Sequence, residues 1–249
     1  MSFVYKPPTE WIPPDSFPTE KLCQAKEIAI DLETRDPNLK ELGPGYIRGD
    51  GEVVGISFAI DGYEDYFPFA HEQGFNFSKK KVIEFTKKIC ATESDKIFHN
   101  STYDIGWLVK EGVTINGRII DTMVVAPLID ENQYWYSLNA LGREYINEGK
   151  TEAELNAAAE EWGLDPKAEM WRLPSAYVGT YATQDAALTL KLWNHFKILL
   201  EEQNLWNVFD LEMRVLPVIL AMKQKGVRVD LERAETLKKQ LIKREKDII

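Results

Sequence analysis

The chain has 249 residues, 44% of them hydrophobic, and a formal net charge of −10 at pH 7. It is long enough to bury one substantial core with a smaller appendage, and no apolar run approaches the roughly 18 residues of a membrane-spanning helix. The negative charge argues against a protein coated with basic surface for nucleic-acid binding, but cations held at an acidic site would still allow local binding of substrate phosphates.

The N-terminus and the cysteines bear on the compartment. Met1 to Pro14 lacks the basic-then-apolar pattern of a secretion signal. Cys23 and Cys90 are too few and too far apart for a disulfide framework or a zinc knuckle. We therefore expect a cytoplasmic protein with reduced cysteines and no membrane anchor.

The first part of the chain is predicted to be an arm followed by a β-meander. Residues 1–24 read as an irregular arm, because five prolines fall within the first 20 positions. A polar loop rich in turn residues is expected from Arg35 to Gly51. Three segments are predicted as antiparallel strands, the last two joined by an Asp61-Gly62 hairpin turn: 27–32, 53–60 and 63–69.

Helices and strands then alternate. A helix is predicted from the N-cap Ser78 to about Cys90, followed by a strand at 96–99, a helix at 102–110 and a strand at 118–120. Strands that alternate with helices pair in parallel. The sequence therefore predicts an α/β fold with a mixed five-stranded sheet, in which three antiparallel strands are followed by parallel strands and flanked by helices.

The C-terminal part is predicted to be almost wholly helical. An alanine-rich helix is expected at 151–162, with Thr151 as its N-cap and Glu154 completing a capping box. A longer helix is expected at 182–202. Residues 206–249 are predicted to form a helical C-terminal extension.

Two acidic residues on the first strand carry the strongest chemical signal. Residues two apart on a strand point to the same face, so Asp31 and Glu33 project together while Leu32 turns away. Two adjacent carboxylates repel each other, and a divalent cation would relieve that repulsion. The pair therefore reads as half of a metal site, although a solvated pair on an edge strand is the structural alternative.

Further acids occur where a cleft is expected. Asp104 stands at the head of a predicted helix, and Asp185 stands near the start of the long helix, four residues after Tyr181 and thus on the same face. Both acids lie next to apolar neighbours that favour burial. Asp104 could instead only favour a helix N-terminus, and Tyr181 could be a core tyrosine. Asp121 is as well suited to capping a helix as to touching metal, and we leave it out of the site.

These residues form three motifs that resemble the exonuclease motifs of the DEDD superfamily: Asp31-x-Glu33, Asn100-x-x-Tyr103-Asp104 and Tyr181-x-x-x-Asp185. The tyrosine four residues before the last aspartate resembles that of the DEDDy branch. Neighbouring segments resemble the proofreading domain of family A (DNA polymerase I-like) DNA polymerases: Val54 to Ala59, His99-Asn100, Asp121-Thr122, and Tyr181-Ala182 followed by Thr189. The resemblance covers about residues 25–205 and implies an RNase H-like 3′–5′ exonuclease domain.

The resemblance also implies roles for these residues. Asp31 would bridge two divalent ions, Mg²⁺ or Mn²⁺, and Glu33 and Asp185 would complete the tighter site. Asp104 would hold the second ion through water. Tyr181 would orient the attacking water, because a phenol with a pKa near 10 is a poor general base. The substrate would be a single-stranded or frayed 3′ end of DNA, and the product a nucleoside 5′-monophosphate.

Three residues beside the motif acids are candidates for contacting the terminal nucleotide: Thr34, His99 and Asn100. His99 differs from several relatives, which carry an amide at this place. The polar loop Arg35 to Gly51 looks longer than is usual in the family. Both departures bear on how the substrate is held after Glu33.

The C-terminal tail resembles the segment that opens the polymerase part of these enzymes. It contains Glu212-x-x-x-Leu216-Pro217 and Gly226-Val227, and Asp230 is predicted to cap a further helix. We therefore expect a fragment of a longer polymerase, of phage or other compact type, that acts as a monomer beside the polymerase domain of the same chain in a prokaryotic cell or phage-infected host.

Two other functions remain open at this point. An RNA-trimming enzyme similar to RNase D shares the acids and the tyrosine, so the motifs do not separate RNA from DNA. An inactive scaffold that only binds DNA is the other alternative, and the presence of all four acids and the tyrosine argues against it.

Overall fold

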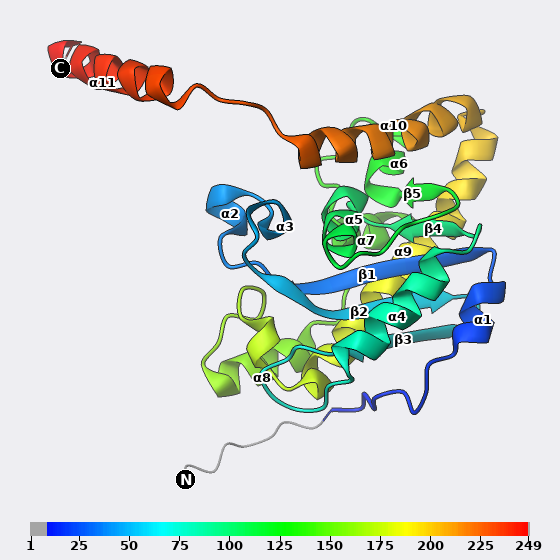
Figure 1. Ribbon diagram of the computed structural model, residues 1–249. Helices are drawn as coiled ribbons and strands as arrows, with labels where there is room; N and C mark the ends of the chain where they lie inside the picture. The colour runs from blue at the N-terminus through cyan, green and yellow to red at the C-terminus, as the bar shows by residue number, and fades with distance from the viewer. Residues whose placement is uncertain (1–8, 249) are drawn as a thin grey trace, which may run out of the picture.

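A five-stranded mixed sheet forms the centre of the computed structural model, which describes residues 9–248 (Figure 1). The strand order is β3-β2-β1-β4-β5. β1 pairs antiparallel with β2 and β2 antiparallel with β3, whereas β4 and β5 continue in parallel from β1. The predicted sheet is therefore confirmed, with these bounds: β1 Glu27–Arg35, β2 Glu52–Ile60, β3 Tyr63–Pro68, β4 Asp95–Phe98 and β5 Ile119–Asp121.

The antiparallel part follows from a buried apolar run and a tight turn. Residues 53–60 are all buried, as expected for a strand covered on both faces. Ile60 pairs with Tyr63, so the connection between β2 and β3 has two residues, and Gly62 adopts a positive φ of 70° that suits such a turn.

The remaining elements are helical. Their bounds are α1 Thr19–Gln24, α2 Leu39–Leu42, α3 Gly45–Arg48, α4 Lys79–Cys90, α5 Ser101–Lys110, α6 Thr122–Ile129, α7 Leu138–Ile146, α8 Ala153–Trp162, the 3₁₀ turn η1 Met170–Arg172, α9 Ser175–Glu202, α10 Trp206–Lys225 and α11 Leu231–Ile248. Within residues 9–248 no helix is both long and apolar enough to cross a membrane.

Helices cover both faces of the sheet. In Figure 1, α4 crosses the near face and α9 lies behind the strands. Ile28, Ile30 and Leu32 of β1 pack in the same core as α4 and α5, whereas Ala29 packs in the core that contains α9. Because strand residues alternate between faces, Asp31 and Glu33 belong to the side of β1 that faces α9.

Two features of the N-terminal region differ from the sequence prediction. The arm becomes helical at α1, where Leu22 is fully buried in the core and holds the turn in place. Residues 1–8 of the predicted arm lie outside the described residues. The polar segment from Arg35 is not an irregular loop, because β1 extends through Arg35 and two helical turns, α2 and α3, follow.

The predicted cap of α8 is wrong. The helix begins at Ala153 after Glu152, and Thr151 instead bonds across to α9, its backbone N–H donating to Gln184 Oε1 at 2.6 Å. Glu154 likewise accepts hydrogen bonds from Thr9 and Thr180 rather than closing a capping box. The long helix α9 starts at Ser175 and therefore contains Tyr181 well inside it.

The tail is helical, as predicted. Asp230 caps α11, accepting a hydrogen bond from the backbone of Arg233 at 3.0 Å. In Figure 1, α11 lies apart from the body of the molecule beyond an extended segment, and none of its described residues is buried.

Candidate metal centre

Three acidic side chains from distant parts of the chain meet beside the sheet. Asp31, Glu33 and Asp185 each bring a carboxylate oxygen to a place where these atoms all lie within 4.8 Å of one another. β1 supplies the first two and α9 supplies the third. Asp185 is buried and the other two are half-buried.

The strand register explains how β1 can present two acids to α9. Asp31 pairs with Ser57 and Glu33 pairs with Gly55, after which the register shifts between Glu33 and Thr34. Gly55 is required here, since a Cβ at this position would lie 2.2 Å from the hydroxyl of Tyr66. The ring of Tyr66 therefore occupies the space that a side chain opposite Glu33 would otherwise fill.

Asp104 is buried on the first turn of α5 and lies outside the set of three oxygens. Burial raises the pKa of Asp104, and repulsion by the charge of Asp31 raises it further. Asp104 thus lies close enough to the cluster to interact with Asp31.

Asp121 acts as a cap for two helices. Its carboxylate accepts from the backbone N–H of Met123 at 2.9 Å in α6, and from those of Asn100 at 2.9 Å and Ser101 at 2.7 Å at the start of α5. Asn100 has a left-handed φ of 71° at this helix start. The role of Asp121 is therefore to orient the helix that carries Asp104.

Asp31 and Glu33 lie in an environment that disfavours their charged forms. Burial is the largest cause that raises the pKa of Asp31 to about 8, and Asp185 adds to the shift. Burial likewise raises the pKa of Glu33 well above its usual range, with Asp31 and Asp185 adding to it. Such mutual repulsion is relieved by a nearby cation.

Lys150 supplies one such cation, and the sequence reasoning missed it. Its Nζ lies 2.5 Å from Asp185 Oδ2 and 3.0 Å from the hydroxyl of Tyr181. Burial lowers the pKa of Lys150, but the charges of Asp185, Asp31 and Glu33 outweigh this, so the pKa is raised. No periodicity marks this residue, because it precedes α8 in a short connection and reaches the site only through the fold.

Tyr181 stands beside Asp185 on α9, as their spacing predicts. Its hydroxyl accepts the hydrogen bond from Lys150. Burial, followed by the charge of Asp185, raises the pKa of this phenol far above its usual value. The side chain is therefore a neutral hydrogen-bonding group at neutral pH and not a base.

The predicted nucleotide contacts lie around the acids. Thr34 Oγ1 is 2.8 Å from the hydroxyl of Tyr103, and Asn100 is exposed. His99 Nδ1 lies 2.9 Å from Thr122 Oγ1, and burial lowers the pKa of His99 to about 4, so the ring is neutral. Its Nε2 is buried without a hydrogen-bond partner among the described residues.

Two hollows flank the acids. One, of about 450 Å³, is lined by Glu33 and Thr34 together with aromatic and basic side chains that include Tyr46, Tyr103 and Lys223. The other, of about 430 Å³, is lined by polar and charged residues that include Asp31, His99, Asn139 and Lys150. Lys167, which is exposed, lines both.

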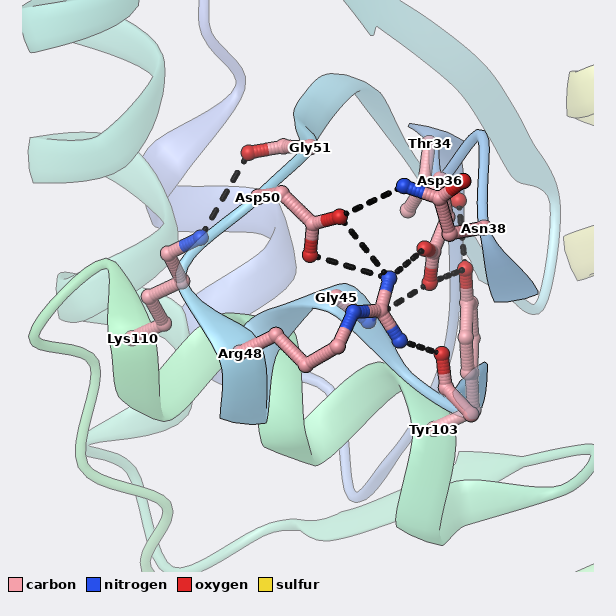
Figure 2. Close-up of polar contacts among 10 residues, drawn as sticks. Thr34, Asp36, Asn38, Gly45, Arg48, Asp50, Gly51, Tyr103 and Lys110 are labelled. Carbon is pink, nitrogen blue, oxygen red and sulfur yellow. Dashed lines mark hydrogen bonds and ion pairs between the residues drawn. The ribbon is translucent and has the colours of Figure 1, made fainter. Parts of the chain in front are cut away.

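A polar network fixes the wall of the first hollow. Figure 2 shows Asp36 accepting hydrogen bonds from the backbone of Gly45 at 2.9 Å, from Arg48 at 3.3 Å and from the hydroxyl of Tyr103 at 3.2 Å. Arg48 also pairs with Asp50 at 2.9 Å. The segment containing α2 and α3 is thereby tied to α5, which places Tyr103 beside Thr34.

The donor set fits hard divalent cations. It consists of carboxylate oxygens, the ligands that Mg²⁺ and Mn²⁺ prefer. Asp185 Oδ1 is buried and has no hydrogen-bond partner within residues 9–248. A buried oxygen left unsatisfied is costly, and coordination of a cation would satisfy it.

Comparison with known proteins agrees with this chemistry. A family model described as 3′–5′ exonuclease matches residues 18–201. A DNA-directed DNA polymerase of Pseudomonas phage M6 is 34% identical over 259 residues, covering 100% of this chain and 39% of that protein. DNA polymerase I of Borreliella burgdorferi is 26% identical over 215 residues, covering 86% of this chain and 22% of that protein.

Among solved structures, the POL domain of Pol1 from M. smegmatis, in complex with DNA primer-template and dNTP, has the same fold. It superposes with a TM-score of 0.63 at 15% identity, covering 92% of this chain and 34% of the other. The chain thus spans well under half the length of the polymerases that it matches.

Proposed function

The chain belongs to the 3′–5′ exonuclease family found in family A DNA polymerases, and from that premise we propose that it removes nucleotides from the 3′ end of DNA by two-metal-ion hydrolysis. This family uses divalent metal ions. The observation that carries the proposal is the convergence of Asp31, Glu33 and Asp185, with Tyr181 beside the third acid.

We assign the metal-binding role to Asp31, Glu33, Asp104 and Asp185. When bound, a pair of Mg²⁺ or Mn²⁺ ions supplies a more acidic water and neutralises charge on the phosphate. Asp31, Glu33 and Asp185 support one ion, because their oxygens converge. Asp104 lies outside that set but interacts with Asp31, which suits a second, more loosely held ion.

The reaction transfers the terminal phosphoryl group to water. A water oxygen bonds to the phosphorus, the bond to the 3′ oxygen of the preceding nucleotide breaks, and that oxygen leaves with a proton. The product is a nucleoside 5′-monophosphate. Tyr181, kept neutral by burial and by Asp185, orients the attacking water through its hydroxyl.

Thr34, His99 and Asn100 are proposed to contact the terminal nucleotide, since they border the two hollows beside Asp31 and Glu33. A frayed or mismatched 3′ end has already lost its base pairing. Delivering it to a separate cleft therefore costs less than melting a matched end, and this favours single-stranded ends and a proofreading role.

We propose that residues 25–205 form the exonuclease domain and that 206–249 open a polymerase domain in a longer chain. The polymerases that match over the whole or most of this chain support that division. All the assigned acids come from one chain, which supports a monomer. Since these relatives are phage and bacterial proteins, we place the activity in a bacterial cytoplasm or an infected host.

Digestion of defined substrates tests the proposal. The chain should shorten 5′-labelled single-stranded DNA with Mg²⁺ or Mn²⁺, release mononucleotides faster from a mismatched than from a matched 3′ end, and stop when EDTA is added. Faster digestion of RNA than of DNA would instead support an RNase D-like enzyme. Binding without hydrolysis would support an inactive scaffold.

A further inference from the structure

The ion pair between Lys150 and Asp185 is more deeply buried than a typical surface ion pair. Its side chain is 16% exposed and that of its partner Asp185 is 5% exposed. The nearby Lys191–Glu148 pair, in contrast, is open to solvent, with exposed side-chain fractions of 53% and 47%. A buried ion pair of this kind is retained only where geometry and hydrogen bonds offset the loss of water.

The backbone around Lys150 is held on both sides. Its own N–H donates to Asn139 Oδ1 at 2.9 Å. Gln184, the residue before Asp185, accepts from the backbone of Thr151 at 2.6 Å and donates to the carbonyl of Gly149 at 3.1 Å. The connection that carries Lys150 is therefore fastened to the same turn of α9 that carries Asp185.

The ammonium and a divalent ion would both act on the carboxylate of Asp185. Nζ hydrogen-bonds to Asp185 Oδ2, and Asp185 is one of the three acids whose oxygens converge. A metal ion on Asp185 would stand a few ångströms from a positive charge, and like charges at such separations repel by about 1–4 kcal/mol, which corresponds to roughly fivefold or more in affinity. The ammonium also holds the hydroxyl of Tyr181 at 3.0 Å.

We propose that Lys150 is the resident counter-ion of this metal centre: it neutralises Asp185 while no divalent ion is bound, is driven from that carboxylate by charge repulsion when an ion binds, and so lowers the affinity of the site for metal. The inference rests on the proposed function, because it requires a divalent ion at Asp185. Lys150 is a positioning residue, acting through Asp185 and Tyr181.

Calorimetric titration of Mn²⁺ into the DNA-free protein tests this directly. Lys150→Gln and Lys150→Met both remove the charge, and both should bind Mn²⁺ roughly tenfold more tightly than the parent chain. Without metal, both variants should melt at a lower temperature than the parent. Saturating Mn²⁺ should then raise the melting temperature of both variants by more than it raises that of the parent. Lys191→Gln, which removes an exposed ion pair of the same kind, is the matched control and should leave the Mn²⁺ affinity unchanged.

A second measurement uses the unaltered chain, so its result does not depend on whether a variant folds. Acetylation by an amine-reactive reagent, read residue by residue by mass spectrometry, should modify Lys150 slowly in EDTA and several-fold faster in saturating Mg²⁺. Lys191 should react equally in both conditions.

The outcomes separate the two proposals. If the parent chain binds Mn²⁺ but both variants bind it with the same or lower affinity, or if Mg²⁺ leaves Lys150 as protected as before, the counter-ion role is wrong while the exonuclease proposal stands. If the parent chain binds no divalent ion, the metal centre itself is wrong and the counter-ion role falls with it.

Discussion

Lys223 of α10 donates a hydrogen bond to the hydroxyl of Thr102 on α5, with Nζ and Oγ1 3.0 Å apart. Thr102 stands two residues before Asp104, and Lys223 also lines the hollow that contains Glu33 and Thr34. α10 lies beyond residues 18–201, the part that matches the exonuclease family. A helix outside the matched region therefore brings a positive charge to the edge of the candidate site.

Lys223→Gln should weaken binding of single-stranded DNA without slowing the chemical step. A lysine that meets a phosphate contributes a uniform, salt-dependent part of the affinity, and its loss should lower the salt slope by about 1. We expect KM to rise severalfold with kcat nearly unchanged, measured from the rate at which single-stranded DNA is shortened at several salt concentrations.

Lys225→Gln, on the same exposed stretch of α10, is the matched control and should leave KM and the salt slope as in the parent. A drop in kcat for Lys223→Gln would mean that α10 supports the position of Asp104 rather than the substrate.

Asp31→Asn should abolish hydrolysis. The carboxylate is proposed to bind metal, and loss of several kcal/mol of transition-state stabilisation corresponds to about a thousandfold or more in rate. In EDTA the same variant should melt at a higher temperature than the parent, because the cost of burying the charged carboxyl of Asp31 and its repulsion by Asp185 are both removed. Residual digestion near the parental rate would refute the metal assignment.

Tyr181→Phe should slow hydrolysis less than Asp185→Asn does. The change removes one hydroxyl, which Lys150 contacts, whereas the carboxylate of Asp185 persists. We expect a loss of about ten- to a hundredfold against about a thousandfold for Asp185→Asn, in single-turnover rates. Calorimetry should find Mn²⁺ binding retained in Tyr181→Phe, and equal losses in both variants would contradict a water-orienting role.

His71 should make the fold sensitive to acid. Its Nδ1 lies 3.0 Å from the carbonyl of Leu173 and must donate to it, so Nε2 accepts from the hydroxyl of Tyr66 at 2.8 Å. Burial lowers the pKa of His71 to about 4. The folded state therefore binds a proton on His71 less readily than the unfolded state does. The contribution of neutral His71 to the free energy of unfolding is fully present above about pH 6.5 and is lost as pH falls through about 4. The loss amounts to up to roughly 3 kcal/mol.

Urea unfolding at several pH values should therefore show the stability advantage of the parent over His71→Gln shrinking between pH 6.5 and 4. His195→Gln, at a partly exposed histidine of α9, is the control and should follow the parent profile. A constant difference between the parent and His71→Gln would show that His71 contributes only packing.

The sheet and the placement of Asp31 and Glu33 could be predicted from sequence. Alternation along a strand is a property of the backbone, so residues 28–33 alone place Leu32 in one core and the two acids on the other face. The spacing of Tyr181 and Asp185 similarly follows from helix geometry, and the Asp61-Gly62 turn from the positive φ that glycine allows.

Other features depended on contacts between distant segments. Thr151 was predicted as a helix cap, yet in the fold it bonds to Gln184, 33 positions away. The helical turns of α2 and α3 are held by Asp36, Arg48 and Tyr103, which local propensity does not bring together.

The fold class, the family and the acidic motifs could be read from local patterns, because strand alternation, helix spacing and turn chemistry act over a few neighbouring residues. The contacts of Lys150 with Asp185 and of Lys223 with Thr102, 121 positions away, became visible only in the folded chain. Such pairs are set by how whole elements pack, and a long lysine side chain leaves no local pattern that reveals where its charge will lie.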